Sequence, residues 1–145
     1  MNILIINGPN LNLLGLREPS LYGTKDYPAL VRFCQDACQE AGVSCEVFQS
    51  NHEGTIVDKI QQAYGVFDGI VINPAAYTHT SVAILDALKA VSIPAVEVHL
   101  TDVDAREPFR HVSYAGLACF TRFTGLGFEG YRQAVLALRD RLKEA

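Results

Sequence analysis

The feature that most constrains the fold is an alternation of short apolar runs with longer amphipathic segments. Two of the runs, Ile3–Ile6 and Gly69–Ile72, carry no polar side chain. A strand with one face in water alternates apolar and polar residues, so an uninterrupted run indicates a strand buried on both faces. Such strands belong to parallel sheets that helices cover on both sides.

The same pattern extends along the whole chain. It predicts strands at Ile3–Ile6, Ser44–Gln49, Gly69–Ile72, Ala95–Val98 and Ala118–Phe123. Apolar residues spaced three and four apart predict helices at Tyr27–Ala41, at Thr55–Tyr64, at Ser81–Val91 and from Glu129 to the C-terminus. We therefore expect an α/β fold of the flavodoxin-like, doubly wound type, with a five-stranded parallel sheet and helices on both faces, formed by residues 1–145 as one domain.

Composition excludes several classes of protein. With 49% hydrophobic and 19% charged residues, the chain is not extensively disordered. Twelve Lys and Arg against sixteen Asp and Glu give a net charge of −4, which provides no basic surface for nucleic acid or an anionic membrane. The four-residue apolar run near the N-terminus is too short for a signal peptide or a membrane span. Four cysteines without C-x-x-C spacing are expected to be structural, in a reducing cytoplasm.

Polar side chains follow four of the predicted strands. Since the carboxyl ends of parallel strands meet at one edge of the sheet, we expect these side chains to form a binding site there. Three of the four histidines belong to this group. Its members are Asn7, Asn10, Asn12, Arg17 and Tyr22, then Gln49, Asn51, His52 and Glu53, then Asn73, Tyr77, Thr78, His79 and Ser81, and finally His99, Thr101, Asp102, Arg106 and Arg110.

The motifs that the sequence lacks exclude several kinds of site. The loop Gly8–Gly23 contains neither G-x-G-x-x-G nor G-x-x-x-x-G-K-[ST], which disfavours a flavin or nucleotide. H-E-x-x-H and G-x-S-x-G are absent from the sequence, so neither zinc nor a serine nucleophile is expected. Lys59 and Lys89 lie within amphipathic helices, which makes a Schiff-base lysine improbable. Acid–base chemistry by Tyr, His and Arg, without metal or cofactor, is the remaining expectation.

Six segments carry a family resemblance: Ile6–Gly15, Arg17–Gly23, Gln49–Gly54, Asn73–Ser81, Val96–His99 and Arg106–His111. In order and register they resemble the motifs of type II 3-dehydroquinate dehydratases. The resemblance implies reversible conversion of 3-dehydroquinate to 3-dehydroshikimate, in the shikimate pathway to aromatic amino acids. It also implies anti elimination of water through an enolate, with no metal, cofactor or imine. Members of the family are typically dodecamers built from trimers.

The resemblance further implies which residues act on the substrate. Tyr22 is the expected base at C2, with Arg17 beside it stabilising negative charge. His99, oriented by Glu97, is the expected acid for the leaving hydroxyl. Asn12 is expected to hold a water molecule against the enolate oxygen.

A second group of residues is expected to bind the substrate. Asn73 and the main-chain amides of Leu100 and Thr101 receive its carboxylate. His79 and Arg110 bind the ring hydroxyls, and Asp86 reaches Arg110 of a neighbouring subunit. Family members commonly have Ser-Asn where this chain has Thr101-Asp102, and Asp102 is expected to add negative charge near the anionic substrate.

Two other functions remain open at this point. One is a flavodoxin-like module that binds a cyclic polyol acid without converting it, and the other is an FMN protein, which would be yellow when purified. The intact set of Arg17, Tyr22 and His99 favours the enzyme, because a binding module has no need of it. Taken singly, three candidates also have structural interpretations: a half-buried loop aromatic at Tyr22, a hydrogen-bonded core histidine at His99 and a solvated helix position at Asp86.

Overall fold

The computed structural model describes residues 1–16 and 25–145, and its centre is one sheet of five parallel strands. These strands are β1 (Asn2–Asn7), β2 (Ser44–Gln49), β3 (Gly69–Asn73), β4 (Ala95–His99) and β5 (Thr121–Thr124). Their order across the sheet is β2-β1-β3-β4-β5. The chain therefore adds β2 on one side of β1 and then adds β3, β4 and β5 on the other side. This order confirms the expected flavodoxin-like, doubly wound fold.

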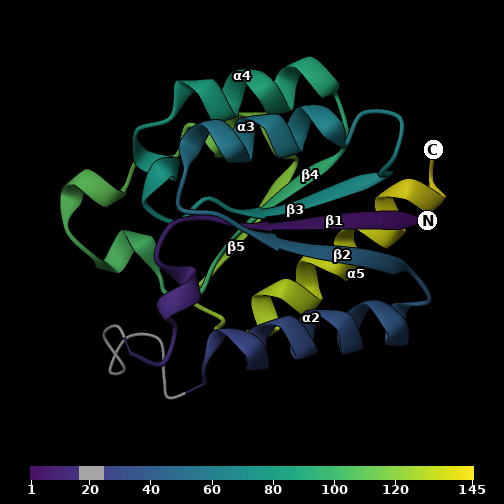
Figure 1. Cartoon of the computed structure of the whole chain (residues 1–145), viewed down its shortest axis with the longest axis horizontal. Helices are drawn as coiled ribbons and strands as arrows, with labels where there is room; N and C mark the ends of the chain where they lie inside the picture. The colour runs from purple at the N-terminus through teal and green to yellow at the C-terminus, as the bar shows by residue number, and fades with distance from the viewer. Residues whose placement is uncertain (17–24) are drawn as a thin grey trace.

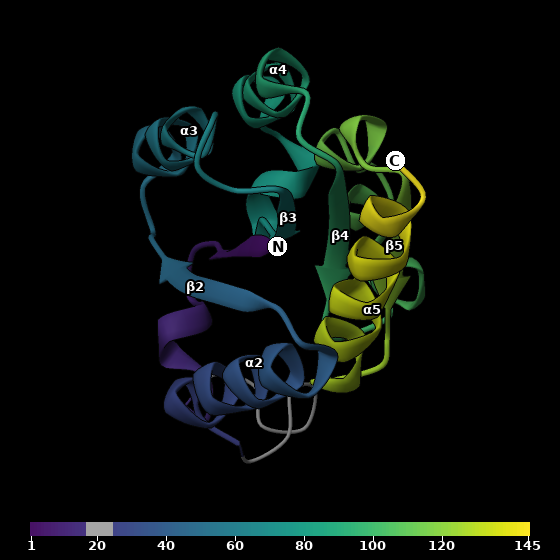
Figure 2. The same ribbon diagram turned by 90° about the vertical axis from the view of Figure 1, so that its right-hand side faces the viewer.

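Four long helices cover the two faces of the sheet. They are α2 (Tyr27–Ala41), α3 (Glu53–Gln62), α4 (Val82–Val91) and α5 (Glu129–Lys143). Helices α3 and α4 lie on one face and α2 and α5 on the other (Figures 1 and 2). In β1, Ile3 and Ile5 pack toward α2 and α5, whereas Leu4 and Ile6 pack toward α3 and α4. The strand is buried on both faces, as its apolar run predicted.

Local signals fix the ends of two helices. Helix α2 begins after Asp26, whose carboxylate accepts a hydrogen bond of 2.9 Å from the N–H of Ala29, and it ends at Gly42 in a left-handed conformation. Helix α4 begins after Ser81, whose hydroxyl accepts the N–H of Ile84 at 3.0 Å. These caps agree with the predicted start and end of α2 and place the start of α4 within one residue.

The fifth strand is shorter than predicted and begins later. Its expected first residue, Ala118, belongs instead to a 3₁₀ turn at Ala115–Ala118, and the N–H of Cys119 donates to Gly116 within that turn. The chain joins the sheet from Phe120, whose N–H donates to the carbonyl of Ala95 at 3.0 Å. An apolar turn, in which only Ala115 is buried, therefore imitated a strand in the sequence.

The remaining expectations concern cysteines and membranes. Cys34 and Cys38 are buried, Cys45 and Cys119 are partly buried, and all four are free thiols. Within the described part of the chain, every helix is too short or too polar to span a membrane.

Candidate active site

A cleft opens at the carboxyl edge of the sheet, where loops from β1, β3 and β4 converge. In Figure 1 this is the edge at which the turn after β1 and the short turns after β4 lie. Two of its lining residues, Asn10 and Ala75, have left-handed backbones with φ of 71° and 53°, a strained conformation that is common at functional sites. The cleft is lined by Pro9, Asn10, Leu11, Asn73, Ala75, Ala76, His79, His99, Leu100, Thr101, Val103, Arg106 and Arg110.

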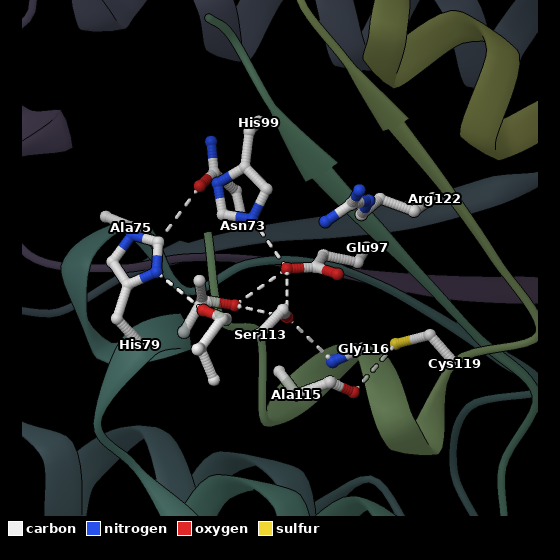
Figure 3. A network of polar contacts seen from close by, with 12 residues as sticks. Asn73, Ala75, His79, Glu97, His99, Ser113, Ala115, Gly116, Cys119 and Arg122 are labelled. Atoms are coloured by element: carbon white, nitrogen blue, oxygen red, sulfur yellow. Dashed lines mark hydrogen bonds and ion pairs between the residues drawn. The ribbon is translucent and has the colours of Figure 1, made fainter. Parts of the chain in front are cut away.

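The last strand to reach the cleft, β4, places a carboxylate beside an imidazole. Alternate residues of a strand share a face, so Glu97 and His99 point to the same side, and Oε2 of Glu97 lies 2.6 Å from Nε2 of His99 (Figure 3). Both side chains are buried. Burial raises the pKa of Glu97, but hydrogen bonds and the charge of His99 outweigh it and bring the pKa to about 2. Glu97 is therefore ionised at neutral pH.

An ionised carboxylate determines which nitrogen of His99 carries a proton. Because Glu97 only accepts hydrogen bonds, the hydrogen of a neutral His99 ring is assigned to Nε2. Nδ1 is then the nitrogen that can exchange a proton with a bound molecule. A carboxylate also stabilises the imidazolium form, so the pair is suited to giving and recovering a proton.

A second imidazole lies beside the first. His79, at the end of a 3₁₀ turn (Ala75–His79), stacks on His99 with ring centroids 6.5 Å apart and planes 16° from parallel. Its Nδ1 donates to the carbonyl of Val112 at 2.7 Å, which leaves Nε2 as an acceptor. Burial lowers the pKa of His79, and the positive charge of Arg110 acts in the same direction. A neutral His79 can accept a hydroxyl hydrogen from a ligand.

The buried amide of Asn73 is held by the opposite layer of the fold. Its Oδ1 accepts the N–H of Ala75 at 3.1 Å, and its Nδ2 donates to the hydroxyl of Tyr131 at 2.9 Å. Tyr131, on α5, in turn donates to Oδ1 of Asn7 at 2.6 Å. Burial raises the pKa of Tyr131 well above its ordinary value, so it stays a hydroxyl. One Nδ2 hydrogen of Asn73 is thus committed, and the other is available to the cleft.

Arginine side chains give the cleft positive charge. Arg110 is the last residue of a short 3₁₀ turn (Pro108–Arg110). Its Nε donates to Glu107 at 2.5 Å, and its guanidinium lies over the ring of Phe109. Arg106 is a further lining residue. Guanidinium groups favour carboxylate and hydroxyl ligands, so the cleft is suited to a small polar anion.

The cleft brings together most of the predicted site residues within the described part of the chain. Six predicted residues line it, namely Asn73, His79, His99, Leu100, Thr101 and Arg110, and Glu97 contacts His99 from behind. Asp102 does not line the cleft in the described structure, and its carboxylate accepts the N–H of Asp104 at 3.1 Å. Asp102 follows the lining residue Thr101 in the chain, and the expectation that it adds negative charge near the ligand stays a prediction.

Other predicted residues lie elsewhere. Asn12 is exposed, outside the lining of the described cleft, and its Oδ1 accepts from Nε2 of Gln49 at 3.4 Å. Asp86 is exposed on α4 and is also outside that lining. Tyr22 and Arg17 fall outside the described residues.

The sequence placed Thr78 at this edge of the sheet, but it did not identify the groups that hold Glu97 and Asn73. Thr78 and Ser113 both donate to Glu97, and Tyr131 donates and accepts in the network around Asn73. One signal was present for the first group: a glutamate inside an apolar strand needs buried hydrogen-bond donors. The sequence did not indicate which residues supply them.

The possible metal ligands are dispersed. Among residues 1–16 and 25–145, no three His, Cys, Asp or Glu side chains come close enough together to hold a metal ion.

Comparison with known proteins identifies the family. The model of the family described as "Dehydroquinase class II" matches residues 1–139. A catabolic 3-dehydroquinase from Aspergillus clavatus is 54% identical over 143 residues, which cover 99% of this chain and 95% of that protein. A 3-dehydroquinate dehydratase from Clostridium perfringens is 49% identical over 144 residues, covering 99% of this chain and all of that one. The crystal structure of type II dehydroquinase from Butyrivibrio crossotus matches with a TM-score of 0.93 at 51% identity, covering 95% of this chain and 97% of that chain. The chain belongs to the class II dehydroquinase family.

Proposed function

We propose that this protein is a 3-dehydroquinate dehydratase, a hydro-lyase that reversibly removes water from 3-dehydroquinate to give 3-dehydroshikimate in the shikimate pathway. The chain acts as one catalytic domain. The observation that carries the proposal is the buried pair of Glu97 and His99 at the cleft, 2.6 Å apart, because elimination of a hydroxyl requires an acid at the leaving group.

The reaction divides into two steps, of which the first is proton removal. Tyr22 takes the proton from C2, next to the ketone, and the electron pair of that bond moves to the ketone oxygen as an enolate. Arg17 stabilises the negative charge of the phenolate and the enolate. The motif Arg17–Gly23 supports both roles. Asn12 holds a water molecule against the enolate oxygen, for which its amide would exchange its present contact with Gln49.

In the second step the enolate collapses and the C1–O bond breaks. The leaving hydroxyl takes a proton from Nδ1 of His99 and departs as water, while the double bond forms between C1 and C2. Glu97 stabilises the imidazolium before the transfer and fixes the ring during it. The reverse reaction uses the same groups in the opposite order.

Substrate binding uses the remaining residues of the cleft. Asn73, with its uncommitted amide hydrogen, and the main-chain amides of Leu100 and Thr101 bind the substrate carboxylate. His79 accepts a ring hydroxyl at Nε2 and Arg110 donates to another. These contacts combine a cationic wall with fixed neutral groups, as recognition of a hydroxylated cyclic acid requires.

We further propose that the active form is a homo-oligomer, a dodecamer of trimers, located in the cytoplasm. Asp86 then binds Arg110 of a neighbouring subunit, which explains why a single chain leaves Asp86 exposed outside the cleft. Large apolar side chains are exposed near both residues, with 51% of Val82 and 67% of Phe109 accessible to solvent. Such exposure favours an interface between copies of the chain.

The test of the proposed function is the ultraviolet absorbance of the conjugated enone after 3-dehydroquinate is added to the purified protein. Absorbance is expected to rise with wild-type protein, with or without a metal chelator, and His99→Ala is expected to abolish most of the rise. A colourless wild-type protein that binds 3-dehydroquinate without any rise would instead support a binding module. A yellow protein would support the FMN alternative.

A further inference from the structure

The carboxylate of Glu97 is bound unevenly. Its Oε2 accepts three hydrogen bonds, from Nε2 of His99 at 2.6 Å, from Oγ1 of Thr78 at 2.7 Å and from Oγ of Ser113 at 2.6 Å. Its Oε1 is buried and has no hydrogen-bond partner within the described structure. Figure 3 shows Oε1 pointing toward the side on which Arg122 and Cys119 lie, away from His79.

The hydroxyl of Ser113 is oriented by its other contact. A hydroxyl has one proton to donate, and Oγ of Ser113 accepts the N–H of Gly116 at 3.0 Å. Its proton is therefore directed at Glu97. Oγ1 of Thr78 lies 3.1 Å from Oγ of Ser113. Because both hydroxyls donate their protons to Glu97, neither has a proton left for a hydrogen bond between them.

The two hydroxyls come from segments that the backbone joins. The N–H of Tyr114, next to Ser113, donates to the carbonyl of Thr78 at 2.8 Å. Thr78 itself is almost fully buried in the 3₁₀ turn that ends at His79. The positions of both hydroxyls relative to β4 are therefore fixed by main-chain structure.

Without these hydroxyls, the carboxylate has a competing orientation. Oε1 lies at a second pocket, lined by Glu97, Ser113, Gly116, Cys119, Thr121 and Arg122. Arg122 is directly opposite Glu97 in the register of β4 and β5, and it forms an ion pair of 3.5 Å with Asp104 at the surface. A buried carboxylate gains from approaching a cation and solvent, so the pocket favours rotation away from His99.

We propose that Thr78 and Ser113 are positioning residues that hold Oε2 of Glu97 against Nε2 of His99 and thereby keep Nδ1 of His99 free to deliver its proton. This inference deepens the proposed function and rests on His99 being its acid. Gly116 belongs to the same arrangement, because a Cβ there would lie 2.7 Å from Oε1 and 3.0 Å from Oγ of Ser113. A side chain at position 116 would displace the carboxylate from the opposite side.

The first test is kinetic and uses the full chain with Thr78→Val and Ser113→Ala combined. We expect kcat to fall between about tenfold and 100-fold, because the acid loses its alignment. KM is expected to change by less than about twofold, because neither hydroxyl lines the described cleft. Thr121→Val is the matched control, since it removes a hydroxyl from the second pocket without a hydrogen bond to Glu97 in the described structure, and its kcat should equal that of wild type.

The second test is ¹⁵N NMR of the His99 ring without substrate, which is independent of turnover. Wild-type protein with a neutral ring should show a protonated Nε2, and the double variant should show a substantial fraction of the Nδ1–H tautomer. Ser113→Thr, made alone, keeps a hydroxyl at position 113 and should give the wild-type signal. Gly116→Ala keeps both hydroxyls but displaces the carboxylate of Glu97, so it should also increase the Nδ1–H fraction. This variant provides the test if the double variant does not fold.

An unchanged tautomer in the double variant, or in Gly116→Ala if the former is unfolded, would overturn the proposal. Loss of kcat in Thr121→Val equal to that in the double variant would also overturn it. If wild-type protein showed no turnover, the proposed function would fail, whereas the tautomer measurement would still decide whether Thr78 and Ser113 position Glu97.

Discussion

At the scale of single residues, Glu97 is the most unusual position in the chain. It lies fully buried in β4, between apolar neighbours on a strand whose five residues are all buried. Ionised groups enter such sites only with hydrogen-bond or charge partners, and here one oxygen has three partners while the other has none in the described structure. The charge is thereby concentrated on the oxygen that contacts the imidazole of His99.

The depressed pKa of Glu97 makes stability depend on pH. Its folded-state pKa of about 2 lies below the ordinary value of 4.5, so its contribution is present above pH 4.5 and is lost as the pH falls toward 2. This linkage corresponds to about 3 kcal/mol. We expect the unfolding free energy of wild-type protein, measured by urea denaturation, to fall over this range by that amount more than the value for Glu97→Gln. Parallel pH curves for the two proteins would contradict the assignment.

The hydroxyl of Tyr131 is expected to matter for stability although it lies outside the cleft. Tyr131→Phe keeps the buried ring but leaves Oδ1 of Asn7 and Nδ2 of Asn73 without their partner. We expect a loss of about 2 kcal/mol in unfolding free energy. Tyr64→Phe is the control, because 71% of Tyr64 is accessible to solvent, and it should leave stability almost unchanged. Equal effects of the two substitutions would show that the buried network contributes nothing.

At the scale of elements, the strands and helices follow from the sequence wherever their signals are local. The apolar run of β1, the Gly42 end of α2 and the Ser81 cap of α4 each agree with the prediction within one residue. Strand β5 was placed too early, because the 3₁₀ turn Ala115–Ala118 is as apolar as a strand, although only Ala115 in it is buried. A short apolar run does not by itself separate a turn from a strand, and here the hydrogen bonds of the folded chain separate them.

The junction of β1 and β3 offers a test of how tightly these elements approach. The N–H of Gly8 donates to the carbonyl of Asn73 at 2.8 Å, and a Cβ at position 8 would lie 2.4 Å from the carbonyl oxygen of Pro74. Gly8→Ala is expected to cost about 3 kcal/mol in unfolding free energy, because main-chain atoms must move apart. Gly54→Ala, in α3 with open space around it, should stabilise by about 0.5 kcal/mol. Thermal or urea unfolding of both variants checks the contrast, and a tolerated Gly8→Ala would refute the close approach.

At the scale of the whole molecule, the sequence predicted those residues of the candidate site whose positions are set by the ends of the strands. His99 ends strand β4, and His79, Thr101 and Arg110 follow strands β3 and β4, so the topology brings them to one edge. Ser113 follows no strand directly, and its place beside Glu97 depends on tertiary hydrogen bonds. The place of Asp86 could not be predicted from one chain, because its proposed partner belongs to another copy.

Assembly is therefore expected to be part of activity. Light scattering should give a particle many times heavier than the 15.9 kDa chain, close to twelve copies by the family resemblance. Asp86→Ala should lower activity while far-ultraviolet circular dichroism stays unchanged, since the side chain is exposed within its own subunit. A fully active monomer would contradict the shared site.

The central claim is that proton removal and loss of the hydroxyl are separate steps with separate residues, and hydrogen exchange at C2 tests it most directly. 3-Dehydroquinate is incubated in D₂O with His99→Ala and, in parallel, with Tyr22→Phe, and deuterium at C2 is followed by NMR. His99→Ala should incorporate deuterium at C2 with little 3-dehydroshikimate formed, because the base still acts while the acid is missing. Tyr22→Phe should give neither exchange nor product. Near-normal product formation by either variant, or exchange that survives in Tyr22→Phe, would contradict the account.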